Sequence, residues 1–199
     1  MLAYSIDAFE DAASVDGVII VAGKHTLSEI ERLVTASSWQ KVQSIVPGGE
    51  RRQDSVAAGL DAVPEESELV AVHDGARPFV TAKLIDACVH AADRTGAAIA
   101  AVPIADTLKQ AEAGVIVRTV PRTGMWAAQT PQVARAALLR DAFANAGELE
   151  ITDEASLMES RGVPVIIVPG SARNLKITTA DDFVLAEALV SATAVKQQP

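Results

Sequence analysis

Short runs of β-branched and aliphatic residues alternate with helical patterns along much of this 199-residue chain, and this alternation constrains the fold most strongly. The runs at 18–21, 42–46, 69–72 and 97–102 are typical of buried strands. The intervening segments have helical periodicity, so the βαβα order predicts an α/β fold with a mostly parallel sheet and right-handed crossovers. Hydrophobic residues make up 49% of the chain but aromatic residues only 4%. That composition suits a sheet whose strands are buried on both faces.

The rhythm changes after Pro103, where the regular alternation of strands and helices stops. Residues 107–109 and 115–120 flank Glu112-Ala113-Gly114, which predicts a hairpin turn. A hairpin does not join a parallel sheet easily, so we expect residues 104–122 to project as a β-arm from one domain spanning residues 1–199. The other expected elements are helices at 135–146, 152–161 and 179–194 and a strand at 165–168.

The net charge of −9 argues against a nucleic-acid partner, because an acidic surface repels a phosphate backbone. Basic residues nevertheless gather in loop-like segments, which favours a basic cleft for a small anionic substrate. They are Arg51, Arg52, Arg77, Arg122, Arg173 and Lys176. The single cysteine, Cys88, excludes an internal disulfide and favours a reducing, cytoplasmic location. No apolar run approaches the ~20 residues that span a bilayer, so no membrane association is expected.

Ligands of open parallel sheets bind at the carboxyl ends of the strands, so the segments after each strand are the first candidates. Gly48-Gly49-Glu50 follows the second strand, and its two glycines allow the backbone to approach a flat ligand. Ser55 begins the next helix, where its hydroxyl and free N–H groups can address a base or a phosphate. An ordinary strand–helix turn capped by Asp54 or Ser55 explains the same residues equally well.

The segment His73-Asp74-Gly75-Ala76-Arg77-Pro78 is the sharpest local signal in the chain. The Asp74 carboxylate offers a hard oxygen to Mg²⁺ at the end of a strand. Arg77 can bind phosphate oxygens, or it can hold the turn through a carboxylate. A purely structural pair of Asp74 and Arg77 is the alternative. His73 is interpreted as structural rather than catalytic.

Polar residues in the second half of the chain stand where they can meet a substrate or begin a helix. Arg122 follows the hairpin and can reach an anion. Lys176 lies between apolar residues just before a helix, a position from which a lysine often points at a charge. Thr152 is most simply the N-cap of the helix that follows it. Trp126 is expected in the core.

Taken in order, six segments of the chain resemble the 2-C-methyl-D-erythritol 4-phosphate cytidylyltransferase family, and the resemblance covers nearly the whole length. The segments are Gly-Gly-x-x-Arg-x-x-Ser-Val (48–56), His-Asp-Gly-Ala-Arg-Pro (73–78), Asp-Thr (106–107), Arg-Thr-Gly-x-Trp-x-x-Gln-Thr-Pro-Gln (122–132), Thr-Asp-Glu-Ala (152–155) and Asn-Leu-Lys-Ile-Thr (174–178). The family fold is a Rossmann-like α/β sheet whose projecting β-arm clasps a second subunit. The implied reaction transfers CMP from CTP to the polyol phosphate and releases pyrophosphate.

The resemblance also implies roles for particular residues at the nucleotide. Gly48, Gly49, Glu50 and Ser55 would lie at the cytidine. The guanidinium of Arg77 would also belong to the nucleotide site.

Asp74 would hold Mg²⁺, as the cofactor of the reaction. Lys176 would meet the transferring phosphates and the acceptor. Arg122, Thr107 and Thr152 would hold the erythritol phosphate, and the first two would reach into the partner's site from the arm of a homodimer. Catalysis would then depend on Lys176, Arg122 and Asp74.

The chain departs from the family pattern at two places. The family begins with a strand and a glycine-rich Pro-x-Ala-Ala-Gly-x-Gly-x-Arg loop that cradles the triphosphate. Met1-Leu-Ala-Tyr-Ser matches a point just after that loop, so we expect an N-terminally truncated domain. Arg173 stands where many relatives have an acidic residue before the Asn-x-Lys.

Two other functions fit parts of the same pattern. One is a cytidylyltransferase for another polyol phosphate, such as ribitol 5-phosphate, because such an enzyme shares the Gly-Gly loop and the Asp/Arg turn. The other is a non-catalytic dimeric binding module that has lost its nucleotide loop. Retention of Asp74, Arg77, Arg122 and Lys176 together argues against the second.

Overall fold

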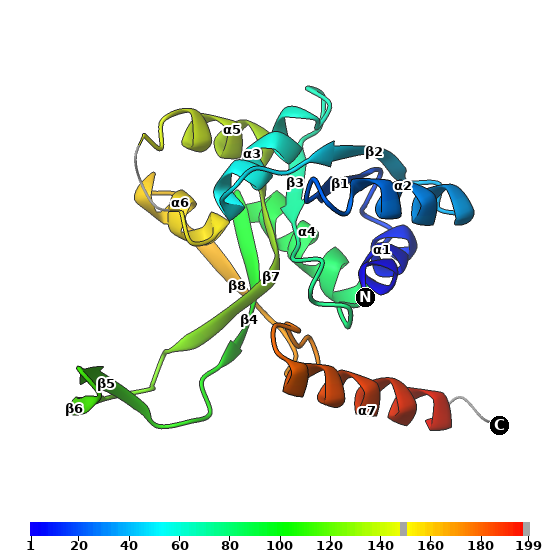
Figure 1. The fold of residues 1–199 in the computed structure, drawn as a ribbon. Helices are drawn as coiled ribbons and strands as arrows, with labels where there is room; N and C mark the ends of the chain where they lie inside the picture. The colour runs from blue at the N-terminus through cyan, green and yellow to red at the C-terminus, as the bar shows by residue number, and fades with distance from the viewer. Residues whose placement is uncertain (148–150, 197–199) are drawn as a thin grey trace.

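A computed structural model describes residues 1–147 and 151–196, and its backbone is organised as helices packed around strands (Figure 1). The first part of the chain contains α1 (Leu2–Asp11), β1 (Val18–Ala22), α2 (Leu27–Ala36), β2 (Val42–Pro47), α3 (Arg52–Asp61), β3 (Leu69–Val72), α4 (Ala82–Thr95) and β4 (Ala97–Pro103). The second part contains β5 (Leu108–Glu112), β6 (Val115–Val120), β7 (Trp126–Arg135), α5 (Ala136–Ala144), α6 (Glu154–Ser160), β8 (Val165–Pro169) and α7 (Ala180–Lys196).

The main sheet has the strand order β3-β7-β4-β8, and a separate parallel pair is formed by β1 and β2. Strand β7 runs antiparallel to both β3 and β4, whereas β4 and β8 are parallel. Three of the four main strands therefore run in one direction. The predicted α/β fold with a mostly parallel sheet is confirmed.

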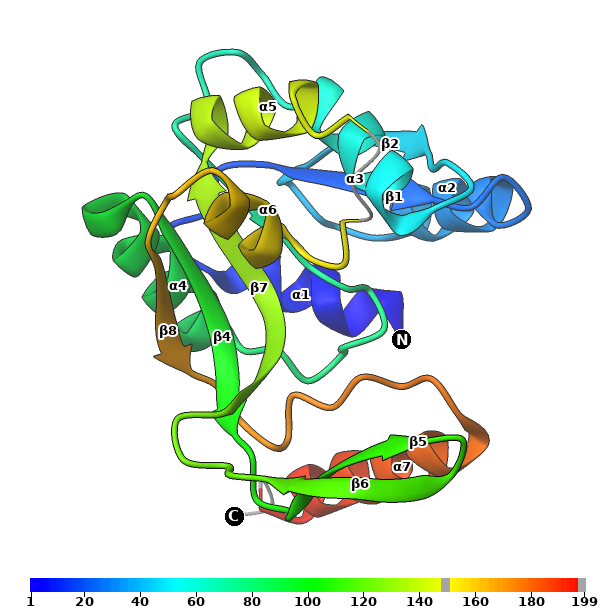
Figure 2. The same ribbon diagram turned by 90° about the vertical axis from the view of Figure 1, so that its left-hand side faces the viewer.

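Helices cover both faces of the main sheet (Figure 2). On one face, Cys88 and Ala92 of α4 pack against Ala98 and Val133. On the other face, α5 and α6 pack on the alternate strand residues, such as Ala97 and Ala134. The small side chains along β4 let helices approach closely, which explains how a core with few aromatic residues is filled.

The predicted hairpin is confirmed as a two-stranded sheet of β5 and β6 that projects from the body (Figure 1). Ala113 and Gly114 form its turn with φ angles of 47° and 82°, in the region that favours glycine. Val115 is 70% exposed, Ile116 60% and Val117 54%, so apolar side chains of the arm face outward.

Several sequence expectations were wrong in detail. Trp126 is 41% exposed and not in the core, because β7 at that point pairs only with Pro103 as the two strands leave the main sheet. The N-cap of α6 is Asp153, whose side chain accepts a hydrogen bond from the Ser156 N–H, so Thr152 lies one residue before the cap. The amphipathic helix α1 was not anticipated. Among the described residues, no helix has the length and apolarity needed to cross a bilayer.

Candidate active site

Asp74 lies just after β3 and is the centre of a cluster of charged side chains. Its Oδ2 is 3.0 Å from Lys176 Nζ and 3.5 Å from Arg77 Nε, and its Oδ1 is 3.6 Å from Arg52 Nε. Burial alone would raise the pKa of Asp74, but the Lys176 hydrogen bond and the charges of Arg52 and Arg77 outweigh it and lower that pKa. Asp74 is therefore a carboxylate at neutral pH.

Arg52 joins Asp74 to a second carboxylate that belongs to the start of α6. Its guanidinium donates to both oxygens of Glu154, at 2.7 and 2.8 Å. The Glu154 side chain is only 3% exposed, so its end of this bidentate ion pair is buried. The hydrogen bond to Glu154 raises the pKa of Arg52 and outweighs the effect of burial. Sequence reasoning placed Arg52 only among the loop cations and missed Glu154, because nothing local indicates a contact across 102 positions.

The turn from His73 to Arg77 is held by a chain of hydrogen bonds. The Asp74 N–H donates to Thr130 Oγ1 at 3.0 Å, and Thr130 Oγ1 lies 3.0 Å from His73 Nδ1. His73 Nε2 lies 3.2 Å from the Arg77 carbonyl oxygen. Since that carbonyl can only accept, Nε2 carries the proton in the neutral ring. Burial lowers the pKa of His73 to about 4, so the ring is neutral near pH 7 and structural, in line with its sequence interpretation.

Lys176 is positioned by a segment that is pinned to the same turn. The side-chain amide of Asn174 is buried and donates to the Thr130 carbonyl at 2.9 Å. Arg77 Nη1 donates to the Asn174 carbonyl at 2.8 Å, and the Ile177 N–H donates to the Ala76 carbonyl at 2.8 Å. Of the two roles considered for Arg77, these contacts correspond to the structural one, in which Arg77 holds the turn. Burial lowers the pKa of Arg77 despite its contact with Asp74.

The Gly48-Gly49 loop lies close to the start of α3. Ser55 Oγ accepts the Gly49 N–H at 3.1 Å, and a Cβ on Gly48 would lie only 2.7 Å from that oxygen. The side chain of Asp54 accepts the Arg51 N–H at 3.2 Å, so the capping alternative also holds for this loop. Glu50 is exposed beside it. A side chain at position 48 would close the space in front of Ser55, which explains the glycine there.

In the described part of the chain, no hydrogen bond or ion pair joins the remaining predicted site residues to Asp74. Thr107 and Arg122 are exposed at the base of the arm, where Arg122 donates to the carbonyl of Ala105. Thr152 is exposed beside α6, with its hydroxyl 3.4 Å from Ser156 Oγ. Two of the residues proposed to bind the acceptor, Thr107 and Arg122, therefore lie on the arm and not in the body.

Gln132 is a buried residue to which the sequence interpretation assigned no role. Its Nε2 donates to Asp153 Oδ2 at 3.1 Å, and its Oε1 accepts the Ala155 N–H at 2.9 Å. These bonds fix the first turn of α6 to β7. Gln132 thereby holds Glu154 in place against Arg52.

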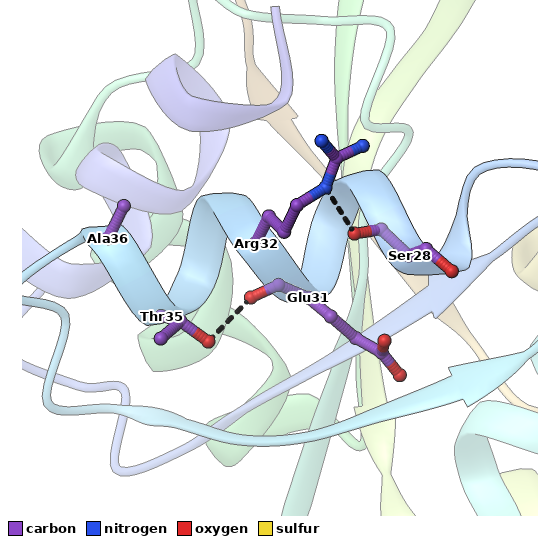
Figure 3. A pocket seen from close by; sticks show the side chains of 5 residues that line it. All are labelled: Ser28, Glu31, Arg32, Thr35 and Ala36. Atoms are coloured by element: carbon purple, nitrogen blue, oxygen red, sulfur yellow. Dashed lines mark hydrogen bonds between the residues drawn. The ribbon is translucent and has the colours of Figure 1, made fainter.

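A shallow depression on the exposed side of α2 is not a comparable site (Figure 3). It is lined by Ser28, Glu31, Arg32, Thr35 and Ala36. Arg32 Nε donates to the Ser28 carbonyl at 3.1 Å, and Thr35 Oγ1 donates to the Glu31 carbonyl at 2.8 Å. These are bonds within one helix, so the depression is an ordinary solvated helix face.

Comparison with known proteins identifies the family of this chain. The family described as 2-C-methyl-D-erythritol 4-phosphate cytidylyltransferase matches residues 1–192. The chain belongs to this family. It is therefore a nucleotidyltransferase, and the family's reaction is CTP-dependent cytidylyl transfer to 2-C-methyl-D-erythritol 4-phosphate in the non-mevalonate isoprenoid pathway.

Individual relatives agree with the family over most of the chain. The cytidylyltransferase of Halalkalibacterium halodurans is 42% identical over 96% of this chain and 84% of its own length. The bifunctional enzyme IspD/IspF of Desulfotalea psychrophila is 46% identical over 94% of this chain, but the chain spans only 48% of that longer protein. The crystal structure of the Thermus thermophilus cytidylyltransferase superposes with a TM-score of 0.81 at 38% identity, covering 96% of this chain and 88% of that one. These descriptions favour methylerythritol phosphate over ribitol 5-phosphate as acceptor.

Proposed function

We propose that cytidylyl transfer takes place at the charged cluster around Asp74, beside the Gly48-Gly49 loop. The supporting observation is that one carboxylate is held among three cations at the carboxyl end of β3, where ligands of α/β sheets bind. The cluster gathers the cations of Arg52, Arg77 and Lys176 around Asp74 and Glu154, and the charge of Asp153 also acts on Arg52. Its cations offer donors to phosphate oxygens in a chain whose net charge is −9.

Lys176 is proposed to move from Asp74 to the phosphates when the nucleotide binds. Its side chain is 42% exposed and makes one 3.0 Å contact with Asp74, so little packing has to be broken. Arg52 and Arg77 are more constrained, because each also donates to a partner on another segment. They would keep Asp74 in position while Lys176 neutralises charge that develops on the transferring phosphate.

The residues around Asp74 fit Mg²⁺ in one particular way. No group of three or more His, Cys, Asp or Glu side chains converges in the described residues, so a cage made only of protein ligands is absent there. Mg²⁺ commonly binds through one or two carboxylates plus substrate phosphates and water. Asp74 would be that carboxylate once Lys176 has moved to the phosphates, since Glu154 is engaged by Arg52. When bound, the ion would neutralise phosphate charge and orient the α-phosphate.

The acceptor is proposed to bind between two subunits of a homodimer. Thr152 stands two residues before Glu154 and so near the cluster, whereas Arg122 and Thr107 are exposed on the arm. Exposed apolar residues of the arm would be covered by a second copy of the chain. A cytoplasmic location stays a prediction that rests on the single cysteine, Cys88. Burial raises the pKa of Cys88 to about 12, so its thiol is unreactive.

The test is Asp74→Asn, measured by pyrophosphate release and by the Mg²⁺ dependence of CTP binding in calorimetry. We expect transfer to be lost and CTP binding to become independent of Mg²⁺, while the circular-dichroism spectrum is unchanged. Asp86→Asn is the matched control, because the Asp86 carboxylate of α4 accepts hydrogen bonds from Ser14, outside the cluster. Unchanged Mg²⁺ dependence in the Asp74 variant would return this carboxylate to a structural role.

A further inference from the structure

The segment that leads into α6 is fastened to the start of α3 on both sides of Thr152. Before Thr152, the Ile151 N–H donates to Gln53 Oε1 at 3.0 Å. After it, both carboxylate oxygens of Glu154 accept from the Arg52 guanidinium. The two anchoring residues are neighbours in the first turn of α3, although the positions that they hold lie 98 and 102 residues further along the chain.

A third anchor of this segment comes from Gln132 of β7, which donates to the Asp153 side chain and accepts the Ala155 N–H. Thr152 is flanked by these fixed residues, yet it is exposed. Its hydroxyl lies 3.4 Å from Ser156 Oγ within the same segment. The structure thus presents an exposed hydroxyl from a backbone that is held by its neighbours.

The groups that make the bonds to α3 are largely withdrawn from water. Ile151 is 7% exposed and the side chain of Glu154 is 3% exposed, while Gln53 is half-buried. A buried N–H or carboxylate that loses its partner is costly, because water cannot replace the lost bond. Each anchor therefore restrains the backbone beside Thr152 more firmly than an exposed contact would.

The same turn of α3 also borders the nucleotide side of the proposed site. Ser55 Oγ accepts the Gly49 N–H at 3.1 Å, and Arg52 Nε lies 3.6 Å from Asp74 Oδ1. One helical turn therefore joins the glycine loop, the Asp74 carboxylate and the segment that carries Thr152. Groups positioned by a helix are held more accurately than groups positioned by a loop, so this turn can fix the spacing between two ligands.

We propose that Gln53 is a positioning residue for the acceptor. Through the Ile151 N–H, it sets where the Thr152 hydroxyl meets the polyol phosphate. The pair of Arg52 and Glu154 fixes the other end of the same short segment. The inference rests on the proposed role of Thr152 as an acceptor contact. Accurate placement matters, because a shift of about 1 Å in a substrate-positioning group can cost about 100-fold in rate.

The test compares two substitutions of Gln53 in steady-state pyrophosphate release. Gln53→Met keeps the length of the side chain but removes the oxygen that accepts the Ile151 N–H. We expect the KM for 2-C-methyl-D-erythritol 4-phosphate to rise about 10-fold, the typical effect of one hydrogen bond, and the KM for CTP to stay unchanged. Gln53→Glu keeps an accepting oxygen and should restore the acceptor KM. A loss of stability alone would leave both KM values unchanged, because it only reduces the amount of folded enzyme.

Two further variants and one further measurement make the result specific. Arg140→Met is the matched control, because Arg140 Nη2 donates to the Val63 carbonyl at 2.9 Å, beyond the other end of α3, and it should leave both KM values unchanged. Thr152→Ala removes the proposed acceptor contact itself. Amide hydrogen exchange by NMR needs no turnover, and exchange of the Ile151 N–H should quicken about 10-fold in Gln53→Met but not in Gln53→Glu.

The outcomes separate this inference from the proposed function. A higher acceptor KM in Gln53→Met, restored in Gln53→Glu and absent in Arg140→Met, supports the inference. If Thr152→Ala raises the acceptor KM and Gln53→Met does not, the inference is overturned and the proposed acceptor contact stands. If Thr152→Ala has no effect, the proposed contact is wrong and the inference falls with it. Unchanged exchange of the Ile151 N–H, or an equal rise in the KM for CTP, also overturns it.

Discussion

The cluster around Asp74 and the β-arm both contain polar residues of the proposed site, but they are held in opposite ways. Side chains from two distant segments and from its own turn converge on Asp74, and Arg52 and Arg77 are each positioned by a further contact. The arm is stabilised mainly by its own ladder and by exposed contacts such as Arg118 Nε to Gln110 Oε1 at 2.7 Å. Removal of Arg52, which pairs with buried Glu154, should therefore affect stability as well as chemistry, whereas substitutions in the arm should affect only what the arm contacts.

The largest expected effect is on the cluster. Arg52→Ala leaves Glu154 buried without its cation, which typically costs about 3–5 kcal/mol in the free energy of unfolding. The matched arm substitution Arg118→Ala breaks an exposed contact and should stay within about 0.5 kcal/mol. Urea denaturation of both variants measures the difference. Equal effects would mean that the two regions do not differ in the way their contacts suggest.

A somewhat smaller effect is expected on catalysis. Lys176→Ala and Arg122→Ala should each lose about 3–4 kcal/mol of transition-state stabilisation, by analogy with removing a donor from an oxyanion hole. Both side chains are partly or fully exposed, so the free energy of unfolding should change little. If the arm serves the partner's site, mixing the two variants should rebuild about a quarter of the wild-type sites in random dimers. Pyrophosphate release measures the recovery, and a mixture as inactive as its components would refute a shared site.

The next effect is the pH dependence of stability, which should originate in the body. The pKa of His73 is about 4 in the fold and about 6.5 in an unfolded chain. Between these values the unfolded chain binds more protons, so stability falls as the pH falls from 6.5 to 4, by about 3 kcal/mol in total. His73→Gln should flatten this part of the curve relative to the wild type. Denaturation at several pH values provides the measurement, and a slope as steep in the variant as in the wild type would exclude His73 as the source.

The sequence was informative where signals are local and uninformative where they are not. Strand runs, the hairpin turn at Ala113-Gly114 and the turn at Asp74 were all recognisable, because each depends on neighbouring residues. The pair of Arg52 and Glu154 was not, because it depends on how α3 and α6 pack. Trp126 was misplaced for a similar reason.

Asp153 was missed as the cap of α6 because Thr152 and Asp153 are both good N-cap residues. Only the backbone path decides between them. The antiparallel insertion of β7 between β3 and β4 was likewise invisible, since periodicity indicates that a strand exists and not where it pairs. For the same reason, periodicity could not predict that β1 and β3 belong to separate sheets.

The smallest expected effect on the folded chain is in the arm, and it tests the homodimer. Ile116 is 60% exposed, so Ile116→Asp should change the free energy of unfolding of a single chain by no more than about 0.5 kcal/mol. If a second copy covers the arm, the same substitution places a charge in an apolar interface and should shift the protein to monomers at micromolar concentration. Asp141→Ala is the matched control, because Asp141 pairs with Arg161 on the exposed surface of the body. Light scattering reports the mass of each variant. A wild-type monomer, or an Ile116→Asp dimer as stable as the wild type, would show that the arm does not form the interface.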